Sequence, residues 1–96
     1  MKKVVTTPVV DSALRTLGQD ERLQVFAWLD HLSNWDSDTF LRENSYPIPG
    51  EPGVYMLRTS SEIRIFFSLD NDAITVLDVA KKQAMMTTAS NSASQL

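Results

Sequence analysis

Four basic residues in the second half of the chain have types and spacings suited to binding an anion. Arg58 and Arg64 lie in the segment VYMLRTSSEIRIFF, and Lys81 and Lys82 follow the run AITVLDVA. Guanidinium groups present planar, paired donors that match a phosphate, and ammonium groups add compact positive charge. Residues 53–82 are therefore the candidate site, and a phosphate group is the ligand that they favour.

The elements that must position these residues are three predicted strands joined as a meander. Runs rich in β-branched and aromatic residues lie on both sides of Ser60 and Ser61, which mark the first turn. Residues 70–72 (Asp-Asn-Asp) have the composition of a second turn. The last strand is predicted to contain Ile74, Val76, Leu77 and Val79.

The register of the first hairpin decides where the arginines point, because a shift of one residue moves every side chain to the other face. A two-residue loop pairs Thr59 with Glu62 and separates Arg58 from Arg64. A three-residue loop pairs Thr59 with Ile63 and sets the two arginines opposite each other. We favour the second register because it separates apolar from charged side chains. Its apolar face contains Tyr55, Leu57, Ile63, Ile65 and Phe67, and its other face contains Met56, Arg58, Arg64 and Phe66.

A short strand and two helices are expected ahead of the meander. Residues 2–6 form the strand, and Thr7 then caps a helix whose first position is Pro8. Gly18 is expected to end this helix, and Asp20 to cap the next one. The second helix has apolar residues at helical spacing, namely Val25, Trp28, Leu29, Leu32 and Trp35, with Leu23 and Phe26 widening the stripe.

Residues 36–52 are interpreted as a connection that crosses the surface from the helices to the sheet. Residues 37–43 are expected to form one or two helical turns. Asp36 and Asp38 could suggest a divalent cation, but an N-cap role is favoured because further carboxylates at loop spacing are missing. Prolines at positions 47, 49 and 52 restrict the rest to extended or turning backbone.

Composition limits the class of protein. A chain of 96 residues without cysteine predicts one domain, with neither disulfides nor thiolate metal sites. No apolar run approaches the ~18 residues of a membrane span, and Thr6, Thr7 and Pro8 interrupt any signal peptide, so we expect a cytoplasmic protein. A net charge of −3 argues against general nucleic-acid binding but leaves room for a local basic patch on the strands.

The order of elements and the strand motifs resemble the RelE/ParE toxin superfamily of type II toxin–antitoxin systems. The resemblance rests on a Leu-Arg strand, a turn, an Arg-x-aromatic-aromatic strand and a last strand that closes on basic residues. The segment FFSLDNDAITVLDVAKKQAM is similar to the HigB-like branch. The resemblance implies an α+β RelE-like domain over residues 1–86, in which the first strand and a two-helix hairpin pack on an antiparallel sheet. Residues 87–96 are small and polar and are predicted to be a disordered tail.

The resemblance also implies an activity, which is metal-independent and cofactor-independent cleavage of mRNA in the ribosomal A site, and hence inhibition of translation. Arg64 would clamp the scissile phosphate, and Arg58 would contact backbone phosphate. Lys82 would stabilise charge or act as an acid, with Lys81 adding to phosphate binding. The implied partners are a cognate antitoxin, the ribosome and mRNA.

Departures from the family pattern support an alternative. Phe67 stands where the family commonly has Tyr, no Tyr or His follows Tyr55, and His31 lies on the second helix. The chain could therefore be a non-catalytic interaction protein of the same fold, either a gyrase-type inhibitor or a degenerate toxin that still binds an antitoxin. A third interpretation is an acidic α+β domain with an unrelated partner. The sequence leaves these alternatives open.

Overall fold

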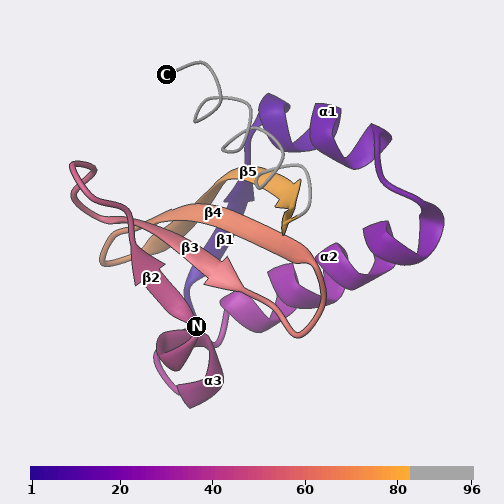
Figure 1. The fold of residues 1–96 in the computed structure, drawn as a ribbon. Helices are drawn as coiled ribbons and strands as arrows, with labels where there is room; N and C mark the ends of the chain where they lie inside the picture. Colours follow the sequence, from indigo (N-terminus) through magenta and orange to yellow (C-terminus); the bar gives the residue numbers. More distant parts are fainter. Residues whose placement is uncertain (83–96) are drawn as a thin grey trace.

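The structure is a computed structural model, and it describes residues 1–82. The predicted tail at residues 87–96 lies outside the described residues. A five-stranded sheet has the order β1-β5-β4-β3-β2 (Figure 1). The strands are β1 (Lys3–Thr6), β2 (Ser45–Pro47), β3 (Val54–Arg58), β4 (Ile63–Leu69) and β5 (Ala73–Lys81). β1 runs parallel to β5 and the other pairs are antiparallel, so the predicted α+β class and the β3-β4-β5 meander are confirmed.

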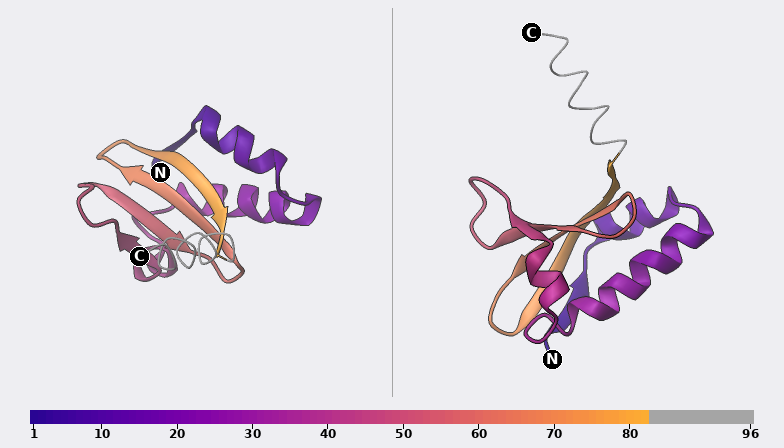
Figure 2. Two further views of the ribbon diagram at one scale, coloured as in Figure 1. Left: turned by 45° about the horizontal axis from the view of Figure 1, so that its top comes forward. Right: turned by 60° about the horizontal axis from the view of Figure 1, so that its bottom comes forward.

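Two helices, α1 (Pro8–Arg15) and α2 (Gln19–Leu32), lie on one face of the sheet (Figure 2). The short helix α3 (Thr39–Glu43) lies near the start of β2 (Figure 1). Asp38 is its N-cap, since its Oδ1 accepts the N–H of Phe40 at 3.0 Å, which confirms the capping role. Among residues 1–82, no helix covers the opposite face of the sheet (Figure 2). We call it the open face and call the other the core face.

The link between α1 and α2 differs from the sequence prediction. Thr7 and Pro8 occupy the N-cap and first position of α1 as expected, although the Thr7 hydroxyl donates to the Leu77 carbonyl at 3.4 Å and does not cap the helix. The helix ends at Arg15 with Thr16 as C-cap, so Gly18 does not terminate it. Gly18 is instead the N-cap of α2, with φ of −68°. The Glu21 carboxylate accepts the N–H of Gly18 at 3.0 Å, and this bond shifts the helix start ahead of Asp20.

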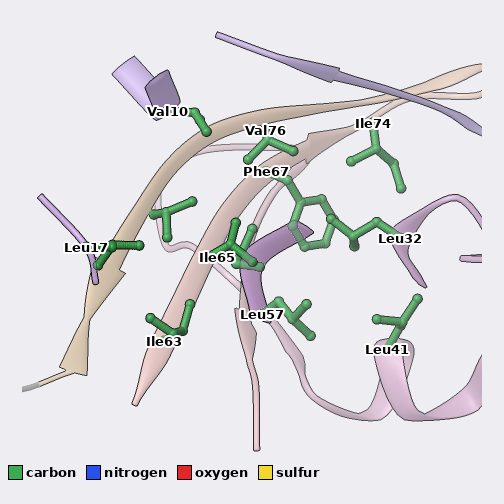
Figure 3. Close-up of a cluster of buried hydrophobic side chains, with 12 residues drawn as sticks. Val10, Leu17, Leu32, Leu41, Leu57, Ile63, Ile65, Phe67, Ile74 and Val76 are labelled. Atoms are coloured by element: carbon green, nitrogen blue, oxygen red, sulfur yellow. The ribbon is translucent and has the colours of Figure 1, made fainter. Parts of the chain in front are cut away.

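The hydrophobic core lies between α1, α2 and the core face of the sheet (Figure 3). Its fully buried side chains include Val10, Val25, Leu32, Leu41, Leu57, Ile65, Phe67, Ile74 and Val76. Leu23 and Phe26 do not join it, because they are 60% and 51% exposed. A helix turns about 100° per residue, so Leu23 lies about 200° from Val25 and Phe26 about 100° from it. The apolar stripe of α2 is therefore narrower than predicted.

The connection predicted ahead of the meander contains the expected helical turns as α3, but its second half forms a β-hairpin with β3. Ser45, Tyr46 and Pro47 pair with Leu57, Met56 and Tyr55, which adds β2 to the edge of the sheet. Pro47 is tolerated because an edge strand has N–H groups that need no ladder partner. Gly50 and Gly53 close the loop with φ of 80° and 76°, in the left-handed region that glycine adopts readily.

None of the helices in residues 1–82 is long and apolar enough to cross a bilayer.

Candidate functional site

The favoured register of the β3–β4 hairpin is confirmed, and it places Arg58 directly opposite Arg64. On β5, Ala80 is the next partner of Arg64, so this row continues with a small side chain. Directly opposed residues lie on the same face of a sheet, with Cβ atoms about 5 Å apart. We call the set Arg58, Arg64 and Ala80 the arginine row. It lies on the open face, since Leu57 and Ile65 alternate with it and point into the core.

Arg64 is held firmly although it lies on the open face. Only 6% of the residue is exposed, and its Nη1 donates to the carbonyls of Ser61 and Ile63 at 2.8 and 2.9 Å. Arg58 is exposed. Among residues 1–82, no carboxylate forms an ion pair with either arginine. The row thus concentrates two positive charges without a counterion from the described chain.

The turn between β3 and β4 is fixed by its hydroxyl groups. The Thr59 hydroxyl donates to the carbonyl of Ile63 at 2.7 Å and accepts the N–H of Ser61 at 3.3 Å. The Ser61 hydroxyl in turn accepts the N–H of Ile63 at 3.3 Å. Because Arg64 donates to the Ser61 and Ile63 carbonyls, these bonds also set the position of its guanidinium group.

The two lysines point to different surroundings. Lys81 pairs across the sheet with Ile63 on the core face, and its Nζ lies 2.9 Å from Oε2 of Glu21 on α2. This bond, together with the Gly18 N–H, lowers the pKa of Glu21. Lys82 is exposed, and its backbone N–H donates to the Glu62 carbonyl at 2.7 Å, beside the turn. The structure therefore brings Lys82 to the arginine end of the hairpin and turns Lys81 toward the helices.

A second row lies on the open face, and to Met56 and Phe66, which the register predicts there, the structure adds Tyr46 and Asp78. Four residues lie side by side across the sheet, one from each of four neighbouring strands. They are Tyr46 on β2, Met56 on β3, Phe66 on β4 and Asp78 on β5. We call these four residues the aromatic row. Tyr46 is 44% exposed, and the other three are half-buried. The turn-forming residues Gly50, Pro52 and Gly53 after Tyr46 were a usable hairpin signal.

Other polar and aromatic candidates lie away from these rows. His31 has its Nδ1 3.8 Å from Oδ2 of Asp38, and its ring lies 5.4 Å from that of Trp28. None of these three residues belongs to the sheet. Tyr55 points into the core face, where its ring stacks on Phe67 at 5.7 Å. Within residues 1–82, no group of three His, Cys, Asp or Glu could hold a metal ion.

Comparison with solved structures identifies the architecture. A chain of the toxin–antitoxin complex RelBE2 from Mycobacterium tuberculosis superposes with a TM-score of 0.70 at 18% identity, covering 83% of this chain and 96% of that one. The fold is that of the RelE toxins. The RelB–RelE antitoxin–toxin complex from Methanococcus jannaschii gives a TM-score of 0.65 at 15% identity, with 88% and 96% of the two chains covered.

The isolated RelE toxin of Escherichia coli also shares the fold, with a TM-score of 0.63, 20% identity and 84% of each chain covered. No protein-family model matches the sequence, and no curated protein matches it. At these identities the RelE likeness establishes the fold, and the chemistry must be argued from the side chains of this chain.

Proposed function

We propose that this protein is the toxin of a type II toxin–antitoxin system and that it cleaves mRNA on the ribosome in the cytoplasm without a metal ion. The observation that carries the proposal is the arginine row. Two like charges directly opposite each other destabilise a sheet, and no carboxylate of residues 1–82 forms an ion pair with either arginine. A phosphate group would supply the missing negative charge and accept paired hydrogen bonds from the exposed guanidinium of Arg58, while Arg64 adds a positive charge that is fixed beside it.

The chemistry assigned to this site is in-line attack of a ribose 2′-hydroxyl on the adjacent phosphorus. The O2′–P bond forms as the P–O5′ bond breaks, water takes up the 2′-hydroxyl proton, and the departing 5′-oxygen takes a proton from water, which leaves a cyclic phosphate and a free 5′-hydroxyl. Arg64 suits the role of clamp because Ser61 and Ile63 already hold its guanidinium, so little reorganisation accompanies the reaction. Arg58, exposed beside it, contacts the same or the next phosphate. Lys82 balances the charge that develops on the leaving oxygen. Lys81, engaged by Glu21 at 2.9 Å, has the smallest part in phosphate binding.

The proposed partners are a cognate antitoxin, the ribosome and mRNA. Support for the antitoxin comes from the solved neighbours, which were captured as toxin–antitoxin complexes. In this chain, Leu23 and Phe26 are three positions apart on α2 and are 60% and 51% exposed. Residues at that spacing are neighbours on a helix surface. They offer apolar contact area to such a partner.

A non-catalytic function on the same fold is the second candidate. It is favoured by the positions of Tyr55 and His31, because Tyr55 is packed against Phe67 and Trp35, and His31 lies on α2. In this case the open face would bind a protein target such as DNA gyrase, or the chain would bind only an antitoxin. A protein of this second kind would bind its target or its antitoxin but would not cleave RNA, and this property distinguishes it from the first candidate.

A purified translation system separates the two candidates. Wild type is expected to cleave the mRNA, and Arg58→Ala is expected to lower the cleavage rate about 100-fold, since removal of one preorganised donor at a reacting oxyanion has that size of effect. Arg64→Lys keeps the charge but loses the paired donors, so its rate should also fall. Arg42→Ala, an exposed arginine on α3, is the matched control and should cleave normally.

Absence of cleavage by wild type, together with inhibition of gyrase supercoiling, would establish the second candidate instead. Equal rates for wild type and Arg58→Ala would show that cleavage does not use the arginine row.

A further inference from the structure

The aromatic row lies one step along the strands from the arginine row. Phe66 is two residues from Arg64 on β4, and Met56 is two residues from Arg58 on β3. Two residues of a strand advance about 7 Å, and both side chains emerge on the same face. The separation suits a nucleotide whose phosphate lies on the arginine row and whose base lies over the aromatic row.

The residue types of the aromatic row also suit a base. Tyr46 and Phe66 supply flat rings on either side of the Met56 thioether, across three adjacent strands. Stacking of bases on aromatic side chains in a positively charged groove is the usual way in which proteins hold single-stranded nucleic acid. The partial exposure of all three residues leaves side-chain surface that the fold does not use. The positive arginine row beside them makes an anionic strand the complementary occupant.

Asp78 closes the row with a carboxylate. Its Oδ1 accepts the N–H of Val79 at 2.8 Å, which fixes the side chain beside Phe66. Within residues 1–82, no basic side chain forms an ion pair with it. An ionised carboxylate only accepts hydrogen bonds. It therefore favours a base edge with an exocyclic amino group, as in cytosine, over the carbonyl that uracil presents at the same position.

We propose that Tyr46, Met56, Phe66 and Asp78 form a base-binding subsite, in which a base of the bound RNA stacks on the aromatic side chains and Asp78 selects a base that carries an exocyclic amino group. This inference rests on the proposed RNA cleavage, and it assigns base preference to residues that are separate from the phosphate-binding arginines. It makes Asp78 a specificity-determining residue and Phe66 a stacking residue.

The test uses the full chain in a purified translation system. The mRNAs are compared in pairs whose A-site codons differ only by cytosine or uracil at one position, and a separate pair is made for each of the three codon positions. Wild type is expected to cleave the cytosine form about 10-fold faster at one of them, the size of effect of one good hydrogen-bonded base contact. Asp78→Asn, which has both a donor and an acceptor, should reduce this ratio to about two or less. Phe66→Leu should slow cleavage of both forms about 10-fold and leave their ratio unchanged.

Asp72→Asn is the matched control, since Asp72 is an exposed carboxylate in the β4–β5 turn, and it should keep the wild-type ratio. Cleavage by Asp78→Asn with the wild-type ratio would overturn the subsite while leaving the proposed RNA cleavage intact. A wild type with no cytosine preference at any position would do the same. Absence of all cleavage by wild type would instead refute the proposed function, and the subsite with it.

Discussion

The two faces of the sheet carry opposite kinds of side chain from the same strands. On β4, Ile65 and Phe67 are fully buried against the helices, whereas Arg64 and Phe66 alternate with them on the open face. The core face contains the apolar area that drives folding. The open face instead gathers like charges and aromatic surface, an arrangement that folding alone does not favour. This difference suggests that strand alternation divides stability and binding between the two faces.

Adjacent phenylalanines give the sharpest test of this division. Phe67→Ala should lower the free energy of unfolding by about 3–5 kcal/mol, because it empties a fully buried site in contact with Trp35 and Tyr55. A loss of this size is a large part of the total stability of a small domain. Phe66→Ala, on the half-buried open side, should cost about 1 kcal/mol. Urea unfolding of both variants measures the difference, and equal losses would contradict the division.

Arg64 allows the division to be tested in the opposite direction. Arg64→Met keeps a long side chain but removes a buried positive charge that faces Arg58, so we expect the free energy of unfolding to stay within about 1 kcal/mol of wild type or to rise. RNA cleavage should fall by about 100-fold or more. The Ile63 carbonyl keeps its bond from the Thr59 hydroxyl at 2.7 Å, which limits the cost of the lost guanidinium contacts.

Chemical denaturation and cleavage rates measured on the same preparation check this prediction. Arg58→Met is the companion variant, since it relieves the same repulsion at an exposed position. If Arg64→Met lost several kcal/mol of stability, Arg64 would be a structural residue. Its presence opposite Arg58 would then be explained by folding and would not indicate a binding site.

The meander could be predicted from sequence because its signals are local and mutually consistent. Alternation of apolar residues favoured one register, and that register correctly placed Arg58 opposite Arg64. The burial of Arg64 could not be predicted in the same way. Strand alternation predicts the face of the sheet on which a side chain lies. It does not predict that the Arg64 guanidinium folds back to donate to the Ser61 carbonyl, because this contact depends on the conformation of the β3–β4 turn.

Met56 and Phe66 of the aromatic row were placed on the correct face from sequence, but Tyr46 was missed because β2 has only three residues and contains Pro47. A segment of this length is too short to show the alternation of apolar and polar residues that indicates a strand. Its strand conformation comes from pairing with β3. Tyr46 consequently became a candidate only once the hairpin was visible. The boundary error at Gly18 has a similar origin, because a side chain three residues later, Glu21, decided where α2 begins.

The smallest expected effect is on the pH dependence of stability, and it distinguishes the two lysines. Lys81 contacts Glu21 on α2, whereas Lys82 lies beside the β3–β4 turn. The pKa of Glu21 is lowered first by its bond to Lys81 and then by the Gly18 N–H. A carboxyl with a lowered folded-state pKa stabilises the protein above its ordinary pKa, 4.5 for Glu21, and this contribution is lost as the pH falls through the folded value. Unfolding measured from pH 6 down to pH 3 should therefore show a weaker loss of stability in Glu21→Gln than in wild type.

Lys81→Met should weaken the pH dependence in the same direction but by less, because the Gly18 N–H still lowers the pKa of Glu21. Lys82→Met should leave it unchanged, since no carboxylate within residues 1–82 pairs with Lys82. Some dependence of the free energy of unfolding on pH should remain in every variant. The reason is Asp70, whose pKa is also lowered, by the N–H groups of Ala73 and Asp72. If Lys82→Met altered the slope as much as Lys81→Met, the assignment of one lysine to the helices and the other to the arginine end would be wrong.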